Sequence, residues 1–221
     1  MITKFFQDRA EGGRFLAKKL VQYANDPSVV VLALPRGGVP VAYEVAQTLK
    51  APLDVFVVRK LGIPGFKECA MGAIASGGIR VLNDNVISYL RMPVEVVDEI
   101  TAEEFTELER RERVYRGTHA PVDVTGQTVI IVDDGLATGS TMRAAVKALR
   151  KKNPKKIVVA VPVGARETCD SFKNEVDTIA VCAITPEPFN AVGLWYRDFS
   201  QTTDAEVQQL LRRAQQTKAA A

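Results

Sequence analysis

Short runs of consecutive apolar residues alternate along this chain with longer segments in which apolar residues return every three or four positions. Uninterrupted apolar runs are typical of strands buried on both faces of a parallel sheet, and the wider spacing is typical of helices with one buried face. The alternation predicts a doubly wound α/β fold, in which a mainly parallel sheet is flanked by helices. The predicted strands cover residues 28–34, 53–58, 129–132, 157–163 and 178–183.

Helical spacing dominates most segments between these runs. An opening helix is predicted over residues 8–24 and a second over 39–49. A long helix is predicted over 94–115, where the many Glu and Arg residues form a solvated face. Another helix begins near Met142, and a last one contains the apolar positions of 207–211. No linker separates these elements, so a single domain is expected.

The strand predicted at 129–132 leads into a polar segment with a distinctive order. Asp133 and Asp134 follow the strand directly, and a stretch of glycines and hydroxyl residues then leads into the helix near Met142. Glycine lets the backbone approach a ligand closely, hydroxyls donate hydrogen bonds, and the unpaired amides at a helix start attract anions. The carboxylates can accept hydrogen bonds from vicinal hydroxyls or face a divalent cation. This order predicts a sugar-phosphate site.

A second candidate for phosphate binding follows the first predicted strand, in the segment 34–40. Arg36 lies beside Gly37 and Gly38, between a strand and a helix. Backbone amides and a guanidinium suit phosphate geometry, although a plain Gly-Gly turn explains these residues as well when they are taken alone. Both polar segments follow parallel strands, so we expect them at the carboxyl edge of the sheet, where open α/β folds bind ligands. Together they predict a ligand phosphorylated at two places.

Composition narrows the class of protein. The 221 residues are 47% hydrophobic and 25% charged with a formal net charge of +3, which is typical of a globular protein and argues against a nucleic-acid partner. The three cysteines are far apart in the sequence, so neither a disulfide framework nor a zinc site is expected. No apolar run is long enough to cross a bilayer, and residues 1–8 lack a signal core. We therefore expect a cytoplasmic protein without a membrane partner.

The segment 129–141 resembles the motif with which type I phosphoribosyltransferases bind phosphoribosyl pyrophosphate (PRPP). Residues 6–13 and 192–196 are similar to those of a poorly characterised bacterial and archaeal group within that family. The resemblance implies the type I phosphoribosyltransferase fold as one domain over 1–221. Its core would span about 28–183, and a small hood and terminal elements would come from 1–27 and 184–221. The resemblance also suggests Mg²⁺ dependence, a homodimer and a role in nucleotide metabolism.

The same resemblance implies roles for particular residues. Asp133 and Asp134 are expected to be catalytic, to hold the ribose hydroxyls, to stay ionised, and to contact Mg²⁺ mainly through PRPP. A mobile loop is expected at about 59–70 with Lys60 as a catalytic residue, and a cis peptide at Arg36–Gly37. Trp195 and Tyr196 are candidates for stacking on the acceptor base, although aromatic residues in such a position are more often part of the core. The residues expected to bind PRPP are Arg36, Gly37, Gly38, Arg59, Lys67, Ala137, Thr138, Gly139, Ser140 and Thr141.

The implied activity is transfer of the 5-phosphoribosyl group from PRPP to a nitrogenous base or related nitrogen acceptor, with release of pyrophosphate. The alternative is a noncatalytic PRPP-binding or nucleotide-binding regulator of the same fold, and the cations of the loop at 59–70 favour turnover. Residues 185–189 depart from the hood patterns of hypoxanthine, adenine, orotate and uracil enzymes, which leaves the acceptor open. A Walker A nucleotide loop is disfavoured, because the spacing from Gly135 to Gly139 is wrong and no Lys follows.

Overall fold

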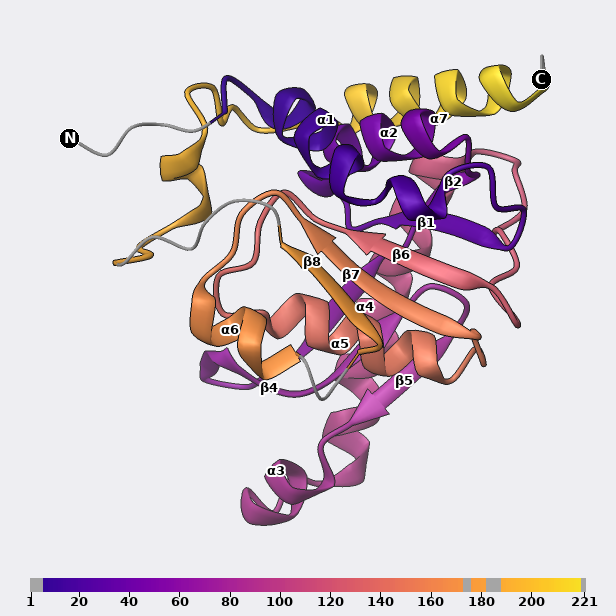
Figure 1. Cartoon of the computed structure of the whole chain (residues 1–221). Coiled ribbons are helices and arrows are strands. Elements are labelled where there is room, and N and C mark those ends of the chain that lie inside the picture. The colour runs from indigo at the N-terminus through magenta and orange to yellow at the C-terminus, as the bar shows by residue number, and fades with distance from the viewer. Residues whose placement is uncertain (1–5, 173–175, 182–187, 220–221) are drawn as a thin grey trace.

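The fold is built around a parallel sheet of five strands in the order β2-β1-β6-β7-β8 (Figure 1). The computed structural model describes residues 6–172, 176–181 and 188–219. Helices cover the sheet on both faces, which confirms the doubly wound α/β class. The five strands are β1 (Val29–Ala33), β2 (Leu53–Val55), β6 (Thr128–Val132), β7 (Lys156–Val161) and β8 (Thr178–Val181).

The two central strands end level with each other, and this register positions the site. Every residue of β1 and β6 is buried, as expected for β-branched and aliphatic runs covered on both faces. The strands are parallel, and the last residue of β1, Ala33, lies opposite the last residue of β6, Val132. The segments that follow the two strands therefore leave the sheet side by side at its carboxyl edge.

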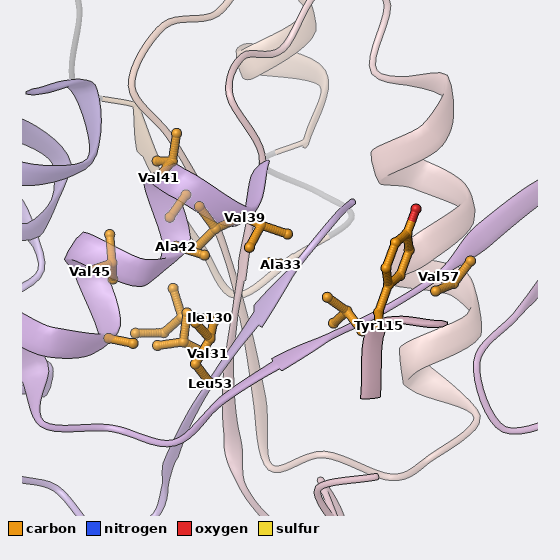
Figure 2. Packing of buried hydrophobic residues seen from close by; sticks show 14 of the residues in the cluster. Val31, Ala33, Val39, Val41, Ala42, Val45, Leu53, Val57, Tyr115 and Ile130 are labelled. Carbon is orange, nitrogen blue, oxygen red and sulfur yellow. The ribbon is translucent and has the colours of Figure 1, made fainter. Parts of the chain in front are cut away.

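One face of the sheet is covered by α1 (Arg9–Lys19), α2 (Gly38–Leu49) and α7 (Asp204–Ala219). Ala42 and Val45 of α2 belong to one buried cluster with the apolar side chains of the sheet, several of which Figure 2 labels. On the opposite face α5 (Ser140–Arg150) and α6 (Arg166–Ser171) pack over a second buried cluster. These two cores hold the sheet edge rigid beneath the loops that it carries.

A second, antiparallel sheet is the main feature that the sequence pattern did not predict. Its strands are β3 (Val58–Ile63), β4 (Phe66–Ala75) and β5 (Ile79–Leu82), in that order. The segment 59–70, expected as a mobile loop, forms most of the β3–β4 hairpin in this structure. Its pairing shifts register around Gly62, and the regular ladder resumes at Leu61 opposite Gly72. The hairpin sheet lies along α5.

Two further helices extend from the hairpin sheet. The chain continues from β5 into α3 (Asp84–Tyr89), which projects from the body, and then into α4 (Val94–Arg116) (Figure 1). The bounds of α4 agree with the predicted helix at 94–115. The opening helix is shorter than predicted, because α1 ends at Lys19 and a 3-10 turn over Val21–Tyr23 follows it. In the part of the chain that the structure describes, no helix is long and apolar enough to span a membrane.

Candidate functional site

The acidic pair at the end of β6 is the centre of the site. The backbone amide of Asp134 donates to Oδ1 of Asp133 at 2.8 Å, which fixes the Asp133 carboxyl against the backbone of Asp134. Oδ2 of Asp134 accepts a hydrogen bond from Nε of Arg9 at 2.8 Å. The hydroxyl of Tyr196 donates to the carbonyl oxygen of Asp134 at 2.6 Å. Asp134 is therefore held by both ends of the chain.

Arg9 is a residue of the site that the sequence did not reveal. Its side chain is 12% exposed, its guanidinium lies 3.9 Å from the ring centroid of Phe199, and its Nη1 donates to the carbonyl of Ser200 at 2.7 Å. Arg9 thus joins α1, the segment before α7 and the acidic pair. The only signal for Arg9 in the sequence was its place in the segment 6–13. That segment supported the family resemblance but indicated no chemical role for Arg9.

Burial and mutual repulsion set the charge state of the pair. Burial raises the pKa of Asp133 well above that of an ordinary carboxyl, and the neighbouring Asp134 carboxylate raises it further. Burial also raises the pKa of Asp134, although the Arg9 guanidinium opposes this rise. From the sequence, both acids are expected to stay ionised while they hold hydroxyls and face a cation. Their burial works against that charge and favours a bound proton or a nearby cation.

The loop after β1 packs directly against this pair, as predicted for two loops at one sheet edge. A Cβ atom at Gly37 would lie 2.9 Å from Cγ of Asp134 and closer still to its Oδ2, and one at Gly38 would lie 2.7 Å from the carbonyl oxygen of Val132. Only glycine fits at either position. Arg36, on the same loop, lies with Nη1 3.6 Å from Oδ1 of Asp204.

The cis peptide bond of this loop joins Pro35 to Arg36. The sequence-based expectation placed it one bond later, at Arg36–Gly37, and is wrong. Neither bond precedes a proline, so no residue type in the sequence distinguishes them.

The second loop, 137–141, ends in the first turn of α5. Gly139 has a φ of 74° and precedes the helix, and a Cβ there would lie 2.8 Å from both Phe172 and Thr168. The side chains of Thr138, Ser140 and Thr141 are exposed, and Oγ1 of Thr138 is 3.0 Å from Oγ of Ser140. Hydroxyls and the free amides of the first helical turn therefore converge on one surface, as a phosphate group requires.

Two backbone carbonyls of this loop accept hydrogen bonds from neighbouring side chains. Oγ1 of Thr168 donates to the carbonyl of Ala137 at 2.5 Å, and Nη1 of Arg143 donates to the carbonyl of Thr138 at 2.8 Å. With its carbonyls satisfied from the protein side, the loop is free to present amides and hydroxyls outward.

The hairpin residues expected to bind PRPP are placed differently. Arg59 is paired with Glu104 and lies within 4.0 Å of Glu107, both on α4, rather than beside the acidic pair. Lys60 lines a cavity together with Ser140 of the loop at 137–141. Lys67 lies in β4, but its side chain is outside the described part of the chain.

The aromatic candidates for acceptor contact are mostly core residues. Tyr196 is fully buried, with its ring 5.6 Å from that of Phe6 and its hydroxyl bonded to Asp134, so it is a core residue that supports Asp134 and not an acceptor contact. Trp195 is 7% exposed and its ring stacks on Phe189 at 6.4 Å between centroids. The hood residues 185–187 lie outside the described ranges.

The described residues contain no group of three or more His, Cys, Asp or Glu side chains arranged to hold a metal ion. The pair Asp133 and Asp134 still fits a magnesium ion, because Mg²⁺ is commonly bound through one or two carboxylates together with substrate phosphates. Burial raises the pKa of both acids, repulsion from Asp134 adds to the rise at Asp133, and the Arg9 guanidinium opposes both shifts. A divalent cation would relieve that repulsion.

Comparison with known proteins agrees with this geometry. The chain is 46% identical over 211 residues to the "Putative phosphoribosyl transferase Rv0571c" of Mycobacterium tuberculosis, covering 96% of this chain and 47% of that protein. The chain thus spans about half the length of this curated relative. A "Bifunctional protein PyrR" from Halalkalibacterium halodurans is 37% identical over 117 residues, covering 47% of this chain and 63% of that protein.

A solved structure shares the fold over nearly the whole chain. The crystal structure of TT1426 from Thermus thermophilus superimposes with a TM-score of 0.84 at 38% identity, covering 95% of this chain and 98% of that one. Residues 5–62 and 64–193 match the family model described as "Phosphoribosyl transferase domain". The glycine-lined loops and the acidic pair described above lie within these ranges. The chain belongs to the phosphoribosyl transferase domain family.

Proposed function

We propose that this protein is a Mg²⁺-dependent phosphoribosyltransferase. It transfers the 5-phosphoribosyl group of PRPP to a nitrogenous base or related nitrogen acceptor and releases pyrophosphate. Membership of the family supports a PRPP-using transferase in general. The acceptor class, the metal and a homodimeric assembly are our own inferences.

One observation carries the proposal: two phosphate-type loops meet around one pair of carboxylates. The Gly37 backbone lies against the carboxyl of Asp134. The loop with the exposed hydroxyls begins at Ala137, three residues after Asp134. PRPP carries a 5′-phosphate, two ribose hydroxyls and a pyrophosphate in that spatial order. Loop 137–141 suits the first, Asp133 and Asp134 the second, and the Arg36–Gly38 backbone the third.

The chemistry is displacement at the anomeric carbon of the ribose, in which the C–O bond to pyrophosphate breaks and a C–N bond to the acceptor forms. The protein's contribution is mainly binding and electrostatics. Backbone amides near Gly37 and the cations Arg36, Lys60 and Lys67 would stabilise the negative charge that develops on the leaving pyrophosphate. A carbon that becomes cationic at the same time is stabilised by the carboxylate of Asp133. No covalent nucleophile of the protein is needed.

Asp133 and Asp134 are the residues that would hold Mg²⁺, mainly through the oxygens of PRPP. When bound, the metal supplies charge neutralisation of the pyrophosphate as it leaves. Arg9 holds Asp134 against the Gly37 loop, and the amide of Asp134 holds the carboxyl of Asp133. Both acids would then be positioned to accept hydrogen bonds from the ribose hydroxyls.

A noncatalytic PRPP sensor is the second candidate, and one contact favours it. Arg59, which turnover was expected to use at the pyrophosphate, is paired with Glu104 and Glu107 of α4. A protein that only binds PRPP can spare this cation. Turnover would require the hairpin to bring its cations toward the Gly37 loop.

The first test is calorimetric titration of PRPP with Mg²⁺ into the wild type and into Asp133→Asn with Asp134→Asn. The double variant keeps the shape of both side chains and is expected to lose PRPP affinity by at least about a hundredfold, because hydrogen bonds to charged groups contribute about 1.5–3 kcal/mol each. Thr141→Ala should weaken binding less. A matched control, Glu103→Gln with Glu109→Gln, removes two exposed charges from α4 and should bind like the wild type. Unchanged affinity in the acidic-pair variant would reject this site.

A further inference from the structure

A cavity of about 300 Å³ lies on the flank of α5, between that helix and the hairpin sheet. The register of the sheet explains the cavity. Lys60, Ala73 and Val81 pair across the three strands, so they form one row and share a face. The next row, with Ala75 at its centre, packs into the core beside α5. In the first row Ala73, together with Ala144 of α5, is too small to fill the space.

The polar lining of the cavity is cationic. Lys60, Arg143 and Lys147 line it together with the amide of Asn83 and the hydroxyl of Ser140. No Asp or Glu is found among the described lining residues, and within the described chain neither Lys60 nor Lys147 is paired with a carboxylate. The charges of Lys60 and Lys147 in this concave site therefore attract anions.

The cavity extends along α5, away from the loop at 137–141. Lys147 follows Ser140 by seven residues of α5, which is about 10 Å along the helix axis. A phosphate group held beside Lys147 is therefore distinct from one held by the loop at 137–141. The two places are linked by Arg143, which lines the cavity and donates from Nη1 to the carbonyl of Thr138 at 2.8 Å.

We propose that this cavity is a second binding site, for a small phosphorylated organic anion of about the size of a nucleoside monophosphate. Its phosphate lies among Lys60, Arg143 and Lys147, and its organic part lies against Ala73 and Ala144. A volume of about 300 Å³ is at the small end of ligand sites, which suits an anion of this size. A phosphate bound in the cavity contacts the Arg143 guanidinium and so changes its hydrogen bond to the Thr138 carbonyl. The cavity shares Lys60 and Ser140 with the residues proposed for the transfer reaction, so the regulatory consequence rests on the proposed function, whereas Lys147 belongs to the cavity alone.

Inorganic phosphate is the probe, and backbone amide NMR shifts of the whole protein are the readout. The protein is first saturated with PRPP and Mg²⁺, and phosphate is then added. Saturable shifts are expected at Ala73, Ala144 and Lys147. Lys147→Ala removes one charge-assisted bond and should weaken phosphate binding about tenfold. Ala144→Leu fills the cavity and should abolish the shifts. Lys19→Ala, which removes an exposed lysine on α1, should leave them unchanged.

The outcomes separate this site from the proposed function. Shifts that do not saturate, or that Lys147→Ala leaves unaltered, overturn the cavity site. Absence of saturable PRPP-induced shifts at residues 137–141 contradicts the proposed function and leaves the phosphate result to stand by itself. The link through Arg143 predicts that phosphate changes PRPP affinity in the wild type and not in Lys147→Ala, because coupling between two sites is reciprocal. Equal PRPP affinities with and without phosphate would refute the regulatory role.

Discussion

Replacing Arg9 with alanine is expected to destabilise the fold and the site together. Arg9 and Asp134 are 12% and 16% exposed, so their ion pair is largely buried. Removing one partner from a buried pair typically costs about 3–5 kcal/mol, and the residual exposure places this pair near about 3 kcal/mol. For a protein of this size, each kcal/mol lowers Tm by about 2–4 °C. Arg9→Ala should therefore lower Tm by about 6–12 °C.

The assay is thermal unfolding of Arg9→Ala, Asp134→Asn and the double variant. Because the cost of Arg9→Ala arises from the buried charge left on Asp134, the double variant should be more stable than the sum of the single effects predicts. Arg9→Lys should recover only part of the loss, since an ammonium cannot reproduce the guanidinium's contacts with Phe199 and Ser200. Arg14→Ala is the matched control on the same helix.

The control and the pH dependence make the reasoning refutable. The Arg14–Glu44 pair is 3.5 Å long and 55% exposed at Arg14, so its loss should cost at most about 0.5 kcal/mol. Without Arg9, the pKa of Asp134 rises further above that of the unfolded chain. Stability from such a group is present at low pH and lost as pH rises, so the deficit of Arg9→Ala should be larger at about pH 8 than at about pH 5. An Arg9→Ala protein that unfolds like Arg14→Ala, with no coupling to Asp134, would refute the clamp.

Three further outcomes follow from the same geometry. Asp133→Asn keeps the oxygen that accepts from the Asp134 amide, and it should raise Tm near neutral pH while PRPP binding falls. An unchanged Tm would show that repulsion between Asp133 and Asp134 is unimportant. Gly37→Ala should weaken PRPP binding at least about tenfold, because its Cβ collides with Asp134. A Cβ atom at Gly62 would meet open space, so Gly62→Ala should bind PRPP normally. Burial raises the pKa of Cys169 to about 11, so iodoacetamide should label it far more slowly in the native protein than in urea, as peptide mass spectrometry can measure. Equal rates would contradict that burial.

The predictable part of the fold was the part governed by local pattern. The strands at β1 and β6 were evident because their residues are buried on both faces and leave unbroken apolar runs. The two glycine loops were evident because each stands between a strand and a helix, and parallel strands carry such loops to one edge. The register that puts Ala33 opposite Val132 then followed from the fold.

The parts that escaped prediction depend on contacts between distant residues. Arg9 and Asp134 are 125 positions apart, and no local pattern connects them. The hairpin sheet was missed because Gly62 interrupts the pattern of β3, and a family resemblance suggested a loop instead. For Tyr196 the sequence left a ligand contact and a core role open, and only its packing against Phe6 and its bond to Asp134 show that it supports the acidic pair.

The central claim is that this site binds PRPP and transfers its 5-phosphoribosyl group. The most direct measurement is release of pyrophosphate from PRPP and Mg²⁺ with a panel of purines, pyrimidines and small amines, each compared with a control that lacks acceptor. We predict release that depends on one acceptor and is lost when Asp133 and Asp134 are both changed to Asn. PRPP binding without release for any acceptor would favour the sensor, and no binding at all would contradict the account.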